Sequence, residues 1–194
     1  MYIIFEGVDT CGKSTQVELF EKRHKNVVIT KEPGGTKVGQ KFREILLEND
    51  EKLSTNAELF LFLADRAEHY EKVVKPYIKN NTVISDRGLI SGIAYALANH
   101  PNLDKKFLLD LNKFALNGNL PRKVILFKTN HALITKRIGN KEQDTIEKRG
   151  IDYLLKVQKL MKETLDSLDI EYLEVNSENT IEEIYKQIEE FIYD

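Results

Sequence analysis

The sequence predicts an α/β fold in which a five-stranded parallel sheet carries helices on both faces. Short runs rich in β-branched and apolar residues alternate from end to end with longer segments of helical periodicity. Such alternation is typical of βαβ units, whose crossover helices cover both sides of a parallel sheet. The 194 residues contain no linker rich in Pro, Gly or Ser, so we expect residues 1–194 to form a single domain.

The elements follow in order along the chain. The expected strands are Tyr2–Glu6, Asn26–Thr30, Thr82–Asp86, Lys123–Lys128 and Glu171–Val175. The segments between them repeat apolar residues at three- and four-residue spacing, as a helix covering a sheet does. Residues 139–150 are polar, charged and nearly free of large apolar residues, which predicts a short mobile lid with Gly139 and Gly150 as candidate hinges. In this fold, ligands bind beyond the carboxyl ends of the strands.

Composition excludes several classes of protein. Lys and Arg number 29 against 31 Asp and Glu, a net charge of −2, which argues against a nucleic-acid binder. The longest apolar stretches, such as Leu59–Ala64, have six residues, too few to span a membrane. The N-terminal residues lack the pattern of a signal peptide, so we expect a cytoplasmic protein. The single cysteine, Cys11, excludes an internal disulfide and a zinc scaffold.

The first strand leads into a phosphate-binding loop. Gly7-Val8-Asp9-Thr10-Cys11-Gly12-Lys13-Ser14 fits the pattern G-x-x-x-x-G-K-[ST] between a strand and a helix, and we include Thr15, which follows, in the ATP site. Loop backbone N–H groups bind phosphate oxygens, Lys13 reaches the β- and γ-phosphates, and Ser14 can ligate Mg²⁺. A chance strand–turn–helix is the disfavoured alternative. A carboxylate inside such a loop, Asp9, must point away from the phosphates, toward a hydroxyl of a second ligand.

The third strand ends in a pair of opposite charges, Asp86 and Arg87. Asp86 occupies the position of the carboxylate that holds Mg²⁺ opposite a phosphate loop, and Arg87 can form a forked contact with a phosphate. The alternatives are a helix-capping aspartate and a surface arginine. A switch GTPase is excluded because the sequence contains no N-K-x-D segment.

Phe62 and Arg66 lie four residues apart on a predicted helix and share one face. A ring and a forked donor placed in this way can stack on a base and bind its edge. Taken alone, the two residues are better explained as a core aromatic and an arginine paired with a carboxylate.

Together these segments resemble the thymidylate kinase family, which transfers the γ-phosphoryl group of ATP to dTMP. The resemblance covers nearly the whole chain. It comprises the loop at Glu6–Ser14, a T-x-E-P-G-G-T turn at Thr30–Thr36, F-x-x-D-R at Phe62–Arg66, Asp86-Arg87 with Ser91 and Tyr95, and the lid.

The resemblance implies a role for each matching residue. Asp9 would bind the 3′-hydroxyl of the acceptor sugar, Arg43 and Arg87 the acceptor phosphate, and Tyr95 would crowd the position of a ribose 2′-hydroxyl. Phe62 would stack on thymine and Arg66 read the base edge. The implied dTMP site comprises Asp9, Glu32, Pro33, Arg43, Phe62, Arg66, Arg87, Ser91 and Tyr95, and the implied catalytic set is Lys13, Asp86, Arg87 and Arg137. Backbone around Asn176–Thr180 would hold adenine, Mg²⁺ would accompany ATP, and the protein would form a homodimer through helices.

The sequence departs from the family pattern where the transferred phosphoryl group usually meets an arginine. Thr10 stands at the loop position, and the lid reads Asp144-Thr145-Ile146-Glu147 in place of D-R-x-E. The remaining candidates are Arg137, which also belongs to the expected ATP site, and Lys141, Lys148 and Arg149. The alternatives are therefore a kinase for another nucleoside monophosphate and a nucleotide-binding module with weak transfer.

The four histidines are scattered along the sequence. We interpret His24, His69, His100 and His131 as surface or helix-end residues, none of them suited to a proton relay.

Overall fold

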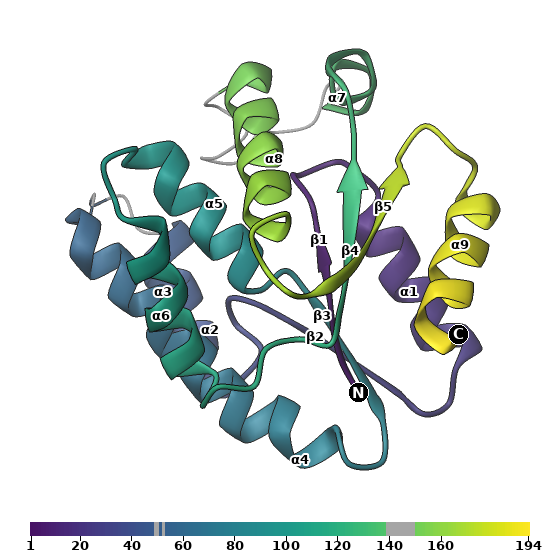
Figure 1. The fold of residues 1–194 in the computed structure, drawn as a ribbon, viewed down its shortest axis with the longest axis horizontal. Coiled ribbons are helices and arrows are strands. Elements are labelled where there is room, and N and C mark those ends of the chain that lie inside the picture. Colours follow the sequence, from purple (N-terminus) through teal and green to yellow (C-terminus); the bar gives the residue numbers. More distant parts are fainter. Residues whose placement is uncertain (49–50, 52, 139–149) are drawn as a thin grey trace.

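The computed structural model describes residues 1–48, 51, 53–138 and 150–194, and its five strands form one parallel sheet in the order β2-β3-β1-β4-β5 (Figure 1). The strands are β1 (Tyr2–Glu6), β2 (Val27–Lys31), β3 (Thr82–Asp86), β4 (Lys123–Lys128) and β5 (Glu171–Asn176). Three match the predicted bounds. β5 ends one residue later than predicted, because Asn176 pairs with Lys128. β2 is shifted by one residue: it begins at Val27 instead of Asn26 and ends at Lys31, which pairs with Asp86.

The helices are α1 (Lys13–Arg23), α2 (Lys37–Arg43), α3 (Thr55–His69), α4 (Lys75–Tyr77), α5 (Leu89–Asn99), α6 (Lys105–Ala115), α7 (His131–Ile138), α8 (Ile151–Leu165) and α9 (Ile181–Tyr193). Wide π-helical turns at Glu44–Glu48 and Tyr70–Val74 continue α2 and α3. No helix among these described segments is long and apolar enough to cross a membrane.

Alternate side chains of the central strands point to opposite faces of the sheet. Ile4 and Val83 belong to a buried cluster with residues of α5 and α8, whereas Ile3 and Phe5 belong to a second cluster with residues of α1 and α9. Figure 1 shows α1 and α9 together on one side of the sheet and α5 and α8 on the other. The predicted parallel sheet with helices on both faces is confirmed.

Strand register brings three loops to one edge of the sheet. Asp86 at the end of β3 pairs with Phe5 of β1 on one side and with Lys31 of β2 on the other. The residues that follow β1, β2 and β3 therefore leave the sheet next to one another. Except for Gly150, the predicted lid at 139–150 lies outside the described residues, so the lid and the single-domain assignment stay predictions.

Candidate nucleotide-binding cleft

The residues after β1 form a loop closed around the side chain of Lys13. The Nζ of this buried lysine donates hydrogen bonds to the backbone oxygens of Gly7 (3.0 Å) and Val8 (3.2 Å). Gly12, directly before α1, has a φ of 99°, a left-handed conformation that glycine adopts without steric cost. The loop thus presents its lysine together with the N-terminus of α1, which favours an anion.

A cleft of about 730 Å³ lies along this loop and gathers residues from the ends of three strands. The predicted residues that line it are Asp9, Thr10, Cys11, Gly12, Lys13, Ser14, Thr15, Glu32, Arg43, Asp86, Arg87 and Arg137. Lys31 of the expected turn and Asn179 of the segment expected to hold adenine also line it, as do Gln16, Ile181 and Ile184, which the sequence did not single out. Clefts of this size accommodate small-molecule ligands.

Arg87 connects the phosphate loop to the strand beside it. Its Nη2 donates to Asp9 Oδ1 (2.6 Å) and its Nη1 donates to the backbone oxygen of Gly7 (2.8 Å). Burial raises the pKa of Asp9, but the charges of Arg87 and Lys13 outweigh burial and leave the pKa below its ordinary value. Asp9 is therefore an anion that pairs with Arg87.

A fully buried carboxylate, Glu6, holds Ser91 at the start of α5. Glu6 Oε1 accepts from the Ser91 backbone N–H (3.1 Å), and Oε2 accepts from the Ser91 hydroxyl. The Ser91 oxygen in turn accepts from Arg87 (3.2 Å). Burial raises the pKa of Glu6. In the sequence, the only indication that Glu6 contacts another segment is that a charged residue ends the apolar first strand.

The turn after β2 places Arg43 beside the cleft. Gly34 has a φ of 100°, and a Cβ added there would lie 3.0 Å from Cδ of Arg43. The absence of a side chain at this residue lets the stem of Arg43 lie against the turn, and Nη1 donates to the Pro33 oxygen (3.1 Å).

Asp86 has an unpartnered oxygen. Within the described ranges its Oδ1 is buried and makes no hydrogen bond. Asp86 lines the cleft together with Ser14. A buried carboxylate oxygen without a donor fits a cation-binding position.

Glu32 lies between two buried side chains of α3. Its Oε2 accepts from Arg66 Nε (2.8 Å), and its Oε1 lies 2.8 Å from His69 Nδ1. His69 is fully buried, so its interpretation as a surface residue is wrong. The histidine is the last residue of α3, but the helical chain continues into the π-helical turn and packs it under the turn after β2.

Arg137 bridges two loops from the end of α7. Its Nη1 donates to the Thr10 oxygen (2.9 Å) and its Nη2 to the Ser177 oxygen (2.8 Å). Arg137 is thus connected to both the phosphate loop and the segment after β5. Lys141, Lys148 and Arg149 lie outside the described residues.

Five predicted dTMP-site residues do not line the cleft in the described part of the chain: Pro33, Phe62, Arg66, Ser91 and Tyr95. Arg66 is connected to the cleft through Glu32. The guanidinium of Arg87 lies 5.6 Å from the centre of the Tyr95 ring. Phe62 is half-buried on α3, one turn before Arg66, and belongs to neither core cluster described above.

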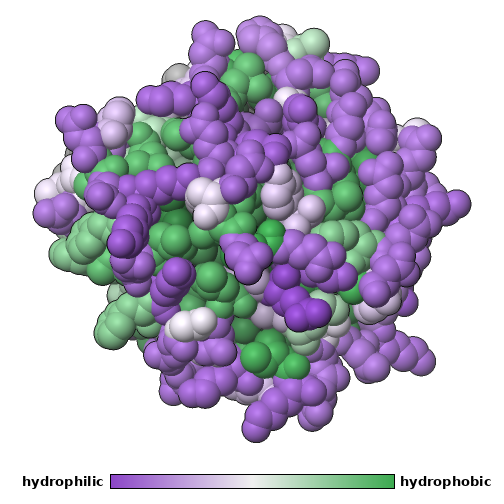
Figure 2. Space-filling model, in the orientation of Figure 1, coloured by the Kyte–Doolittle hydropathy of each residue, from purple (hydrophilic) through white to green (hydrophobic). Residues whose placement is uncertain are grey.

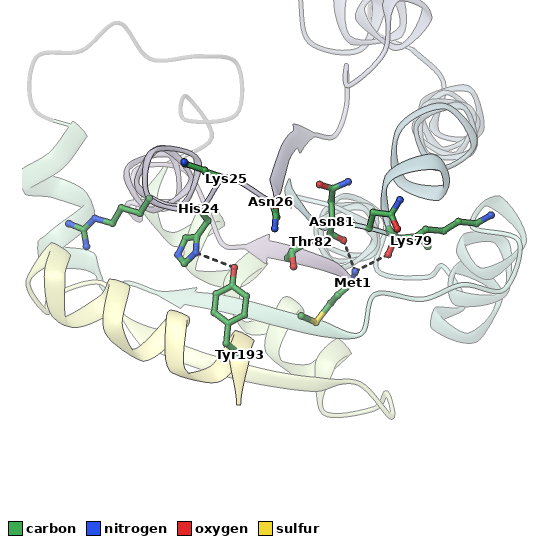
Figure 3. A pocket seen from close by; sticks show the side chains of 11 residues that line it. Met1, His24, Lys25, Asn26, Lys79, Asn81, Thr82 and Tyr193 are labelled. Carbon is green, nitrogen blue, oxygen red and sulfur yellow. Dashed lines mark hydrogen bonds between the residues drawn. The ribbon is translucent and has the colours of Figure 1, made fainter.

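A smaller hollow of about 550 Å³ lies at the opposite edge of the sheet, where β2 and β3 begin (Figure 3). His24 and Tyr193 border it and are 3.4 Å apart between Nδ1 and the hydroxyl oxygen. None of the site residues predicted from the sequence lines it. The larger cleft is therefore the candidate functional site.

Comparisons with known proteins agree with this geometry. The family model described as "Thymidylate kinase" matches residues 5–188. A thymidylate kinase of Campylobacter concisus is 51% identical over 193 residues, covering 99% of this chain and 98% of the relative. One of Campylobacter hominis is 53% identical over 195 residues, covering 99% and 100%. The crystal structure of thymidylate kinase from Ehrlichia chaffeensis shares the fold, with a TM-score of 0.77 at 24% identity, covering 100% of this chain and 98% of that one.

We predict that the stability of Asp65→Asn relative to wild type increases as pH rises. Asp65 is 1% exposed and accepts from the Gly34 N–H (3.0 Å), and burial raises the pKa of its carboxyl from 3.8 to about 6. Between pH 4 and 6 the folded protein binds this proton and the unfolded chain does not, so wild-type stability falls with pH. The variant should gain on the order of 2–3 kcal/mol over this window.

Urea unfolding at pH 4, 5, 6 and 7 measures the difference. Asp110→Asn, which removes an exposed carboxylate of α6, is the control and should change stability little. A constant difference between Asp65→Asn and wild type across these pH values would contradict the prediction.

Proposed function

The chain belongs to the thymidylate kinase family, which transfers the γ-phosphoryl group of ATP to dTMP to give dTDP and ADP, and we propose that this transfer takes place in the cleft along the phosphate loop. The Asp9–Arg87 pair is the observation that carries the proposal. It joins the loop expected to bind ATP to an arginine expected to bind the acceptor phosphate, so that the two nucleotides meet at this pair.

The loop of Gly7–Ser14, with Thr15, binds the phosphates of ATP. Lys13 exchanges its two backbone partners for β- and γ-phosphate oxygens, which is a small movement because its ammonium already lies inside the loop. The positive end of α1 adds to the attraction. Backbone of residues 176–180 holds adenine, and the hydrogen bond from Arg137 to the Ser177 oxygen fixes this segment against the loop.

Ser14 and Asp86 hold Mg²⁺. The unpartnered Oδ1 of Asp86 supports this assignment, since Mg²⁺ is usually bound by one or two protein oxygens together with phosphate oxygens and water. When bound, the ion neutralises charge on the β- and γ-phosphates during transfer.

Arg43 and Arg87 bind the phosphate of dTMP. Both guanidinium groups are already held by backbone oxygens, Arg43 by Pro33 and Arg87 by Gly7, so little freedom is lost on binding. Two anionic substrates repel one another, and these arginines with Lys13 offset the repulsion where the phosphoryl group passes.

Asp9 and Tyr95 select the sugar. Asp9 is ionised and accepts a hydrogen bond from the 3′-hydroxyl. The Tyr95 hydroxyl is buried and has no hydrogen-bond partner within the described residues, and its ring lies beside Arg87. A 2′-hydroxyl would enter the space next to this ring, which favours a deoxyribose.

Phe62 and Arg66 select the base. They lie one turn apart on α3, and Arg66 is connected through Glu32 to the turn that carries Pro33. Phe62, outside both core clusters, is available to stack on thymine, while Arg66 donates to the edge of the base.

We further propose a homodimer through α3 and α6. These two helices pack on each other and carry the exposed side chains of Phe60, Phe107 and Phe114, which are 59%, 55% and 84% exposed. Figure 2 shows hydrophobic residues gathered on the side of the molecule where these helices lie. Large exposed apolar groups on neighbouring helices are typical of an interface. Because ATP and dTMP are nucleotides of the cell interior, we assign the enzyme to the cytoplasm.

We predict that Lys13→Ala and Phe62→Ala have different effects. Lys13→Ala removes the positive charge that lies beside the transferred phosphoryl group and should lower kcat about 10²–10³-fold. Phe62→Ala removes stacking and should raise the KM for dTMP roughly 10-fold with little change in kcat. Steady-state kinetics with dTMP, UMP, dCMP and AMP as acceptors measures both. Tyr77→Ala, which truncates an exposed aromatic residue of α4 that does not line the cleft, is the control, and a preference of the wild type for another acceptor would reject the function.

Arg137 should supply the charge that Thr10 does not. Arg137→Ala is expected to lower kcat about 10²-fold, and Arg137→Lys should restore part of it, since the charge is kept and the fork is lost. Lys136→Ala, an exposed neighbour on α7, is the control for loss of a positive charge. Single-turnover kinetics measures the transfer step, and an unchanged rate in Arg137→Ala would assign the role to a residue of 139–149.

Phe114→Glu should convert the protein to monomers, because a charged side chain would be buried in the proposed interface. Light scattering coupled to gel filtration measures the molar mass. Lys186→Glu on α9, at the other side of the sheet, is the control for added negative charge. A wild-type mass of one chain would reject the dimer.

A further inference from the structure

A buried chain of hydrogen bonds holds Arg66 between two other elements. Arg66 is only 3% exposed. Its Nε donates to Glu32 after β2 (2.8 Å), and its Nη1 donates to Asn112 Oδ1 on α6. A guanidinium removed from water in this way needs its partners, because a buried charge without them destabilises the fold. The position of Arg66 is therefore set by residues on both sides of α3.

On one side, Glu32 is itself held by His69. Glu32 Oε1 lies 2.8 Å from His69 Nδ1, and His69 Nε2 lies 2.8 Å from the hydroxyl oxygen of Thr30. A neutral imidazole satisfies both contacts: Nδ1–H donates to Glu32, and Nε2 accepts from the hydroxyl of Thr30. With one oxygen on Arg66 and the other on His69, the Glu32 carboxylate has a fixed orientation.

On the other side, Asn112 has both ends of its amide occupied. It is 2% exposed, and its Nδ2 donates to the Leu108 oxygen (2.7 Å), one turn earlier on α6. This bond directs Oδ1 at Arg66. The amide cannot rotate without losing both contacts, so Asn112 acts as a fixed acceptor.

Gly92 of α5 limits the remaining freedom of the guanidinium. A Cβ added to Gly92 would lie 3.1 Å from Arg66 Nη1 and 3.2 Å from Nη2. Arg66 thus lies directly against the backbone of α5, next to Ser91. Nη2 makes no hydrogen bond within the described residues, so one donor nitrogen is left for a ligand.

We propose that Asn112 and the Glu32–His69 pair are positioning residues that fix Arg66 as an obligate donor to the 4-carbonyl of the pyrimidine. Thymine presents an acceptor at this atom, whereas cytosine presents an amino group, and a guanidinium has no acceptor to offer the latter. Fixing the guanidinium denies it the rearrangement that would admit a 4-amino base. The inference rests on the proposed function, in which Arg66 reads the base edge.

Asn112→Leu tests the proposal in the full-length enzyme, because it removes the acceptor at similar volume. Kinetics with dTMP and dCMP should show a KM for dTMP raised roughly 10-fold, an unchanged KM for ATP, and a roughly 10-fold smaller preference for dTMP in kcat/KM. Asn112→Asp keeps the acceptor oxygen and should stay within about 3-fold of wild type. Thr164→Val is the matched control, since Thr164 is also a buried helical side chain bonded to a carbonyl one turn earlier, on α8.

The outcomes separate this inference from the proposed function. A wild type that does not prefer dTMP rejects the proposed function. Two results in an enzyme that prefers dTMP overturn the positioning role alone. In the first, Asn112→Leu changes neither the KM for dTMP nor the preference for dTMP over dCMP. In the second, it changes the KM values for dTMP and ATP equally. Should Asn112→Leu fail to fold, Gly92→Ala is tested by the KM for dTMP and the preference for dTMP over dCMP. Alanine favours the helical conformation of α5, and its Cβ would contact and displace the guanidinium of Arg66.

Discussion

The ion pair between Asp9 and Arg87 is the interaction on which the arrangement of the cleft depends. It connects the loop after β1 to the residue that follows β3, and parallel register places these segments side by side. Arg87 reaches back because it adopts a left-handed φ of 68°, a conformation that costs a non-glycine residue free energy and that the contacts of its guanidinium offset. Because Arg87 compensates its negative charge, the Asp9 carboxylate can lie in a loop that binds phosphate.

The arginines of the cleft share one design. Each donates to a backbone carbonyl from another segment: Arg43 to Pro33, Arg87 to Gly7, and Arg137 to Thr10 and Ser177. Long side chains lose rotamer entropy when they bind, and a guanidinium already held by a carbonyl has lost much of it in folding. Carbonyls are neutral acceptors, so they orient the guanidinium groups of Arg43 and Arg137 without cancelling their charge, which remains available to phosphate oxygens. Arg87 differs because it also forms an ion pair with Asp9.

The sequence predicted the residues that bind substrates better than the contacts that hold those residues in place. The phosphate loop, Asp86 and Arg87 follow strands directly, and a local pattern identifies them. The strand ends at Lys31 and Asn176 were missed because they depend on the length of the neighbouring strand. His69 and Asn112 were missed for a deeper reason. A polar residue on an amphipathic helix has the same local pattern whether it faces solvent or a buried partner. The partner of His69 is Glu32, 37 residues away along the chain, and the partner of Asn112 is Arg66, 46 residues away.

The missing family arginines have a structural counterpart. The backbone oxygen of Thr10, at the loop position where an arginine is usual, is occupied by the guanidinium of Arg137. A Cβ on Gly12 would lie 3.5 Å from Nη1 of the same group. An arginine at residue 10 would bring a like charge to the loop that Arg137 already contacts, and like charges repel. The loop residue and the residue at the end of α7 therefore constrain each other, and a chain with arginine at 137 in this orientation favours a small neutral residue at 10.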